Sequence, residues 1–235
     1  MVEEVDSYWY HRPESDHPPR SVQVPDQLDG EGPERLFIGF GKLDLTSKQR
    51  RALVREWCRA LPNVAGVRLL WIGIQAPQAL FDAACRVSGL EGLWIKHSRV
   101  QSLESLPASS SLRHFHLGSS TSLESIAPLR ECCRLETLRL KNIKKIRKLD
   151  PISSLRELKE FGIDGSMWTT QRIDTLGPVG RLTELQYLSI VNLRASDRTL
   201  SPLFTLRKLR RFRCASWWNT EELAKLRELN PELVD

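Results

Sequence analysis

The chain lacks long apolar runs and paired-cysteine patterns, and these absences exclude several classes of protein. No segment approaches the roughly 18 consecutive apolar residues of a membrane-spanning helix. The opening residues lack the basic and apolar regions of a secretory signal, so we expect a cytoplasmic protein without membrane association. The five cysteines have neither CxxC nor Cys/His zinc spacing, which predicts reduced, mostly buried thiols and no disulfide framework.

Charge is distributed unevenly along the sequence. Residues 1–34 carry nine acidic and two basic residues, a net charge of −7, whereas the rest carries 33 basic and 20 acidic residues, a net charge of +13. The acidic segment also contains five prolines and few aliphatic residues. Such a segment cannot bury enough apolar surface to fold alone, which predicts an extended N-terminal arm. Its aromatic residues 7–10 either dock on the body or form an exposed partner peptide.

An internal repeat dominates the rest of the chain. The skeleton apolar-x-x-apolar-x-apolar occurs seven times, at intervals of 22 to 27 residues. Its starts are Val67, Leu90, Leu112, Leu135, Leu158, Leu185 and Leu209. A proline follows two residues after an aliphatic residue in the second half of several repeats, at Pro128, Pro151, Pro178 and Pro202. Since one such unit cannot bury its own apolar surface, the repetition predicts a stacked solenoid.

This pattern resembles the leucine-rich-repeat family, in particular the short-repeat subclass of internalins and phosphatase regulatory subunits. The resemblance covers roughly residues 64–218. It implies an α/β solenoid, a curved horseshoe with a parallel sheet on the concave face and short helices or turns on the convex face. We therefore predict an arm at residues 1–34, an N-terminal cap with a helix at 35–66, about seven repeats at 67–218 and a C-terminal helical cap at 219–235.

The two ends carry helix signals. Thr46 is a predicted N-cap for residues 47–61, where apolar residues recur at helical spacing, and Thr220 is the predicted cap of a helix after the last repeat. The family's usual turn asparagine is replaced by Ser98, Ser120, Ile143, Ser166, Leu193 and Trp217. We expect serines, water or neighbouring peptide groups to satisfy that turn, and Ile143 and Leu193 to be buried there.

Positions between the skeleton residues point to the concave face. The middle column reads Trp71, Trp94, His116, Arg139, Gly162, Ser189 and Arg213. Because exposed Trp, Tyr and Arg dominate interface energetics, we predict a partner-binding site on this face. Its predicted members are Trp71, Trp94, Lys96, His114, His116, Arg139, Lys141, Tyr187, Arg211 and Arg213. Alternatively, the two tryptophans pack beneath the arm or cap. An acidic arm on this basic face would be autoinhibitory.

The sequence predicts a monomeric, non-enzymatic scaffold that binds another protein. A secreted bacterial effector or an immunity-type inhibitor is an alternative. Nucleic acid or another polyanion is a further alternative, because residues 139–149 contain six basic residues and residues 206–213 contain five. The repeat register divides the first group between the two faces, so it does not form one groove.

Catalysis and metal binding have little support in the sequence. His114 and His116 have no carboxylate neighbour in their row, and they lack a third ligand unless the arm supplies His11, His17 or an acid. No catalytic, cofactor or metal site is therefore predicted. The longest repeat contains Trp168, which either extends the contact surface or plugs a longer turn.

Overall fold

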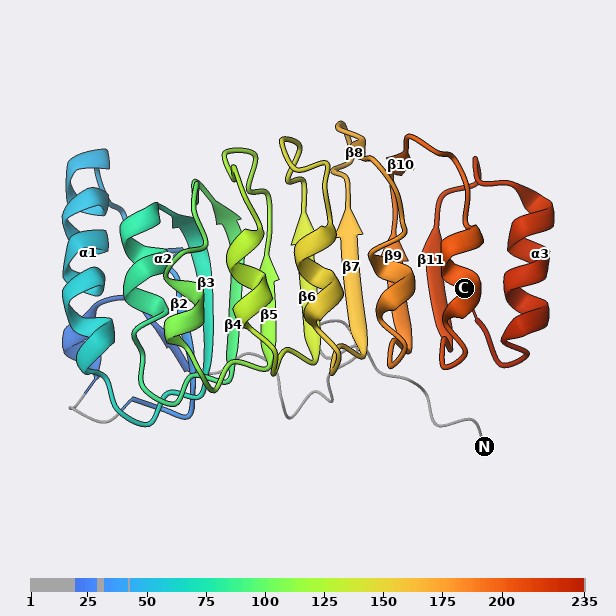
Figure 1. The fold of residues 1–235 in the computed structure, drawn as a ribbon. Helices are drawn as coiled ribbons and strands as arrows, with labels where there is room; N and C mark the ends of the chain where they lie inside the picture. Colours follow the sequence, from blue (N-terminus) through green and yellow to red (C-terminus); the bar gives the residue numbers. More distant parts are fainter. Residues whose placement is uncertain (1–19, 29–31, 42, 235) are drawn as a thin grey trace.

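A computed structural model describes residues 20–28, 32–41 and 43–234, in which the repeats stack side by side in one row (Figure 1). The predicted docking of residues 7–10 lies outside the described residues. Within the described part, strands form one layer and helical segments form the other. Helices α1 (Ser47–Ala60) and α3 (Thr220–Leu229) stand at opposite ends of the row (Figure 1).

The main sheet is parallel and has nine strands in the order β1-β2-β3-β4-β5-β6-β7-β9-β11. Its strands are β1 (Arg20–Val22), β2 (Arg35–Ile38), β3 (Leu69–Ala76), β4 (Gly92–Ser98), β5 (His114–Leu117), β6 (Thr137–Lys141), β7 (Glu160–Asp164), β9 (Tyr187–Ile190) and β11 (Arg211–Cys214). Every predicted skeleton contributes a strand, β3 being the first, so the predicted solenoid is confirmed. The sheet nevertheless begins earlier than expected, because β1 lies inside the segment predicted as an arm.

The longest repeat adds a second, smaller sheet. Strands β8 (Gln171–Ile173) and β10 (Leu193–Ala195) pair in parallel at one edge of the solenoid (Figure 1). The side chain of Trp168 is 90% exposed in the loop between β7 and β8. The interpretation of Trp168 as a plug is therefore wrong.

The second layer consists of α2 (Gln78–Ala84) and a series of single-turn 3-10 helices. These short helices are η2 (Pro25–Gln27), η3 (Leu61–Asn63), η4 (Leu106–Ala108), η5 (Ala127–Glu131), η6 (Asp150–Ser154), η7 (Val179–Arg181) and η8 (Ser201–Thr205). The repeated prolines stand in the first turn of η5, η6 and η8 and at the N-cap of η7. A proline there loses no helical hydrogen bond, since the first N–H groups have no intrahelical acceptor. None of the described helices is long and apolar enough to cross a bilayer.

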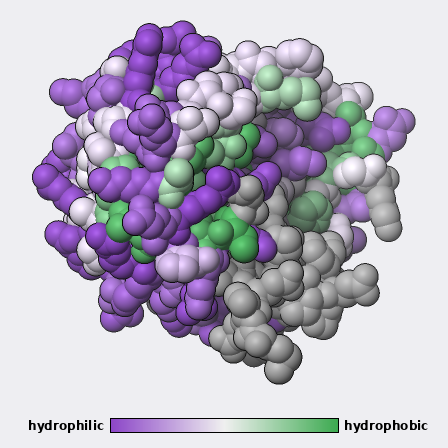
Figure 2. All heavy atoms as spheres, turned by 90° about the vertical axis from the view of Figure 1, so that its right-hand side faces the viewer, coloured by the Kyte–Doolittle hydropathy of each residue, from purple (hydrophilic) through white to green (hydrophobic). Residues whose placement is uncertain are grey.

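Helical caps close both ends of the row. Thr46 caps α1 as predicted, because its hydroxyl accepts from the Gln49 N–H while the Gln49 side chain accepts from the Thr46 N–H. At α3 the predicted cap is one residue too late. The N-cap is Asn219, whose side-chain oxygen accepts from the N–H groups of Glu221 and Glu222. Figure 2, viewed from the α3 end, shows a mainly hydrophilic surface with small hydrophobic patches.

The core runs along the whole solenoid between the two layers. Skeleton residues such as Leu70, Phe115 and Phe161 are fully buried, so each repeat completes the core of its neighbours. Ile143 and Leu193 are also fully buried, as predicted. At the same turn of earlier repeats the hydroxyls of Ser98 and Ser120 bond to each other.

Candidate functional site

The positions between the skeleton residues form the face of the sheet that points away from the helices, here named the far face. Its middle column is defined by strand register. Paired neighbours along it are Phe37, Trp71, Trp94, His116, Arg139, Gly162, Ser189 and Arg213, in that order. The column read from the sequence is therefore correct in register. The structure extends it by two residues, Phe37 on β2 and its register partner Ser21 on β1.

Aromatic rings occupy the N-terminal half of this column. Trp71 and Trp94 are paired on adjacent strands and both are half-buried. The ring of Trp94 lies 5.3 Å from the ring of His116, centroid to centroid, at an interplanar angle of 48°. Such tilted aromatic contacts are favourable beyond simple area burial.

Phe37 was missed because it precedes the first predicted repeat. Its ring lies against Gly73 on the neighbouring strand, where a Cβ would come within 2.5 Å of the ring. Glycine at this position therefore makes room for the aromatic side chain. The signal available in the sequence is the alternation of Leu36, Ile38 and Phe40, which are all buried and mark a strand.

His116 is buried between the aromatic and the charged halves of the far face. Burial lowers its pKa to about 3, and the positive charges of Arg139 and Lys141 act in the same direction. The imidazole is therefore neutral at physiological pH. It contributes an aromatic surface and not a cation.

A charged network fills the C-terminal half of the far face. The guanidinium of Arg139 lies 3.3 Å from the carboxylate of Glu160 and 2.9 Å from that of Asp164. The second carboxylate oxygen of Asp164 accepts hydrogen bonds from the Ser189 hydroxyl and the Val191 N–H. Arg139 is only 3% exposed. It is held inside a charge-compensated network, which differs from the exposed contact residue that the sequence suggested.

The side chain of Arg139 reaches across β7 because the residue between is a glycine. A Cβ on Gly162 would lie 3.0 Å from the guanidinium carbon. Beyond β7, that guanidinium carbon lies 5.6 Å from the ring centroid of Tyr187, which is also buried. Arg139 and Tyr187 thus stabilise one another within the face.

The remaining predicted site residues lie around this column. Lys96, Lys141 and Arg213 are exposed on the far face, whereas His114 and Arg211 are half-buried. The Nδ1 atom of His114 is 3.1 Å from the hydroxyl of Thr137 on the adjacent strand. The far face therefore combines half-buried aromatic rings with exposed basic side chains.

Basic residues after β6 do not join the far face. Lys144, Lys145, Arg147 and Lys148 are exposed on the turn that follows the strand. Lys145 pairs with Glu124 and Arg147 pairs with Asp174, each from another repeat. The basic segment is thus divided between two surfaces, as its register predicted.

Nucleophilic attack by a cysteine and metal binding are the other chemistries that these side chains could support. All five cysteines are free, and Cys133 is exposed while Cys85 and Cys132 are buried. Burial raises the pKa of the Cys85 and Cys132 thiols, the opposite of what a nucleophilic cysteine requires. Within the ranges that the structure describes, no three His, Cys, Asp or Glu side chains are grouped so that they could hold a metal ion.

Solved structures share this architecture. An internalin (inlF) from Listeria monocytogenes aligns over 74% of this chain with 20% identity and a TM-score of 0.59. Internalin C2 of the same organism aligns over 78% of this chain and 80% of its own, with 22% identity and a TM-score of 0.59. A leucine-rich-repeat protein from Leptospira interrogans aligns over 75% of this chain, with 14% identity and a TM-score of 0.57. The chain has a leucine-rich-repeat fold.

The similarity to these leucine-rich-repeat structures is one of fold. The chain spans about half the length of the inlF internalin and of the Leptospira protein, 48% and 50% respectively. No protein-family model matches the sequence, and no curated protein matches it either. The far face of this leucine-rich-repeat solenoid must therefore be interpreted from its own residues.

Proposed function

We propose that this chain is a non-enzymatic scaffold that binds a partner protein through the far face, with Trp71 and Trp94 at the centre of the contact. The observation that carries the proposal is the register of these two tryptophans on adjacent strands, next to His116. Large aromatic side chains contribute most to protein interfaces, because they bury much area with few rotatable bonds.

The charge around the aromatic residues indicates the chemistry of the partner. Lys96 and Lys141 are exposed beside the aromatic column, whereas Arg139 is compensated by Glu160 and Asp164. The accessible charge near Trp94 is therefore positive. A partner with apolar side chains flanked by acidic residues fits this surface, and the lysines would increase its association rate.

The proposal is tested by capture from a native lysate with the wild-type chain and two variants. Trp94→Ala removes the central ring, and Lys96→Glu reverses the charge beside it. We expect a bound protein to lose affinity by about 30-fold or more with Trp94→Ala, as for a central interface tryptophan. Lys96→Glu should mainly lower the association rate and make binding less sensitive to salt.

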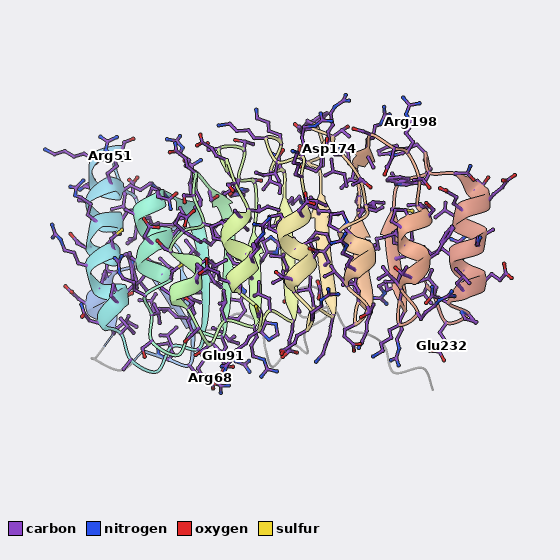
Figure 3. The ribbon with its side chains drawn as sticks, in the orientation of Figure 1. Arg51, Arg68, Glu91, Asp174, Arg198 and Glu232 are labelled. Carbon is purple, nitrogen blue, oxygen red and sulfur yellow. The ribbon has the colours of Figure 1, made fainter. Side chains whose placement is uncertain are left out.

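A matched control is available on the opposite layer. Arg51→Glu makes the same charge reversal on α1, at an exposed position far along the row from the middle strands (Figure 3). Binding that survives Arg51→Glu but not Lys96→Glu would support the far face. A partner that binds Trp94→Ala as tightly as wild type would exclude it. A loss with Trp168→Ala instead would place the contact on the loop after β7.

A further inference from the structure

Strands β8 and β10 pair at one edge of the solenoid (Figure 1). Side chains from this edge line a hollow of about 520 Å³. It is separate from the far face. The side chains that define it are those of Arg147, Arg172, Arg194, Arg198, Trp217 and Trp218. Arg172 and Arg194 belong to β8 and β10, Arg147 and Arg198 to loops, and the two tryptophans to the loop before α3. Four guanidinium groups therefore surround one hollow and make it strongly positive.

Two of these arginines lie directly opposite each other. Arg172 on β8 and Arg194 on β10 are register partners in the small parallel sheet. Both are exposed, and neither forms an ion pair among the residues that the structure describes. Like charges in directly opposed strand positions destabilise a sheet. An anion placed between them would remove that repulsion.

The other two arginines complete the rim. Arg147 bonds to the carboxylate of Asp174 at 2.9 Å and to the hydroxyl of Ser196 at 3.0 Å, so its guanidinium is held in place by two repeats. Arg198 has a left-handed backbone with φ of 54°. Figure 3 shows Asp174 and Arg198 at the same edge of the solenoid. Asp174 thus compensates only one of the four guanidinium groups, while those of Arg172, Arg194 and Arg198 have no ion-pair partner among the described side chains.

The two tryptophans supply a platform and a buried donor. The guanidinium carbon of Arg194 lies 5.2 Å from the ring centroid of Trp217, which is 46% exposed. The Trp217 indole N–H is already used, because it donates to the Leu193 carbonyl at 3.1 Å. Trp218 differs: it is only 5% exposed, and in the described part of the chain its indole N–H has no acceptor. A buried donor without an acceptor is destabilising, because it has lost its hydrogen bond to water.

We infer that this hollow binds a phosphate monoester dianion. A guanidinium group can form two parallel hydrogen bonds to the oxygens of a phosphate. A phosphate with two negative charges also neutralises more of the positive charge of the unpaired arginines than a carboxylate with one. The unsatisfied Trp218 N–H supplies one further donor. The volume is in the range of small-molecule sites and leaves room for the group that carries the phosphate beside Trp217.

The surroundings favour a single phosphate over a nucleic-acid backbone. The adjoining hollow is lined by the carboxylates of Glu124, Asp150 and Asp174 as well as by basic residues. There Glu124 and Asp174 already pair with Lys145 and Arg147, so an extended polyanion would compete with these carboxylates for the basic side chains. A compact monoester contacts only the arginine-rich part.

The inference is tested by titrating the ¹⁵N-labelled full chain with inorganic phosphate, O-phosphoserine and phenyl phosphate, while following the tryptophan indole N–H resonances. We expect saturable shifts of the Trp218 and Trp217 signals. The three probes separate free phosphate, an alkyl monoester and an aryl monoester. Tighter binding of phenyl phosphate would identify Trp217 as a ring platform.

Variants decide whether the arginines are responsible. Arg172→Gln/Arg194→Gln should weaken binding by about tenfold or more, because it removes two charged hydrogen-bonding groups. The control Arg51→Gln/Arg55→Gln removes the same charge from α1 and should bind like wild type. Circular dichroism establishes that each variant is folded. If the double variant does not fold, Arg198→Gln alone should still weaken binding.

Thermal unfolding gives an independent readout. Phosphate monoester should raise the melting temperature of wild type but not that of Arg172→Gln/Arg194→Gln. The inference is overturned if no probe gives saturable shifts, or if the α1 control weakens binding equally. It is also overturned if a short single-stranded RNA binds more tightly than the monoesters with the same sensitivity to these arginines. None of these three results affects the proposal for the far face.

Discussion

The two halves of the far face share one strand geometry but differ in the burial of their side chains. Strands β3 to β5 carry Trp71, Trp94 and His116 in the middle column, and both tryptophans remain partly accessible. Strands β6 and β7 carry Arg139 and its carboxylate partners, which are buried against one another. One half has apolar surface left to contribute to an interface, whereas the other holds its central charges in an internal network.

This difference shows that repeat position does not determine what a side chain does. Trp94 and Arg139 occupy equivalent positions two strands apart. Arg139 is withdrawn because Gly162 leaves space on the next strand and because Glu160 and Asp164 stand within reach. Next to Trp94 the adjacent strand carries His116 and not a glycine, and the two rings lie side by side.

The largest expected effect on stability comes from removing the cation of the buried charged network. Arg139→Met leaves the carboxylates of Glu160 and Asp164 buried without their cation, which should lower the free energy of unfolding by about 3 kcal/mol or more. Lys96→Met removes a cation that is exposed on the same face and should change it by less than about 0.5 kcal/mol. Urea unfolding of both variants measures the difference. Equal losses would mean that Arg139 behaves as a surface residue.

A smaller effect is expected at the boundary between the halves, where His116 is buried. Its pKa is lowered to about 3 in the folded chain from about 6.5 when unfolded. The unfolded state therefore binds a proton first as the pH falls, so stability is present above about pH 6.5 and is lost progressively between about pH 6.5 and pH 3.

From about pH 7 to about pH 5, His116 should account for a loss of about 2 kcal/mol in the free energy of unfolding. His116→Gln should lose correspondingly less stability over that interval. Urea unfolding at the two pH values checks this, with His97→Gln as the control for loss of an exposed histidine. A wild-type pH dependence unchanged by His116→Gln would contradict the assignment.

The smallest effects concern the two ends that flank these halves. Thr46→Ala and Asn219→Ala each remove an N-cap and should each cost about 1 kcal/mol of stability. Thr220→Ala, one residue into α3, should have little effect, since Asn219 makes the capping bonds. Thermal unfolding of the three variants tests this. If Thr220→Ala lost more stability than Asn219→Ala, Thr220 would be the N-cap, as the sequence predicted.

Most of the strand arrangement can be predicted from the repeat alone. A skeleton of Leu, Ile and Phe at fixed spacing gives the strands, their order and their register, because a shift of one residue would expose the whole apolar set. Thr46 and Gln49 similarly mark the start of α1. The start of α3 is not fixed by residue type, since Asn219 and Thr220 are both good N-caps and only the backbone conformation distinguishes them.

The state of each side chain on the sheet could not be read from the repeat in this way. The sequence by itself determined a solenoid and the column in which Trp94 and Arg139 stand, because burial of a periodic apolar set is a local and repetitive requirement. Only the tertiary structure decided that Arg139 is neutralised, that Trp168 is exposed and that Arg172 faces Arg194. These outcomes depend on which side chains of other repeats lie within a few ångströms, and no single repeat contains that information.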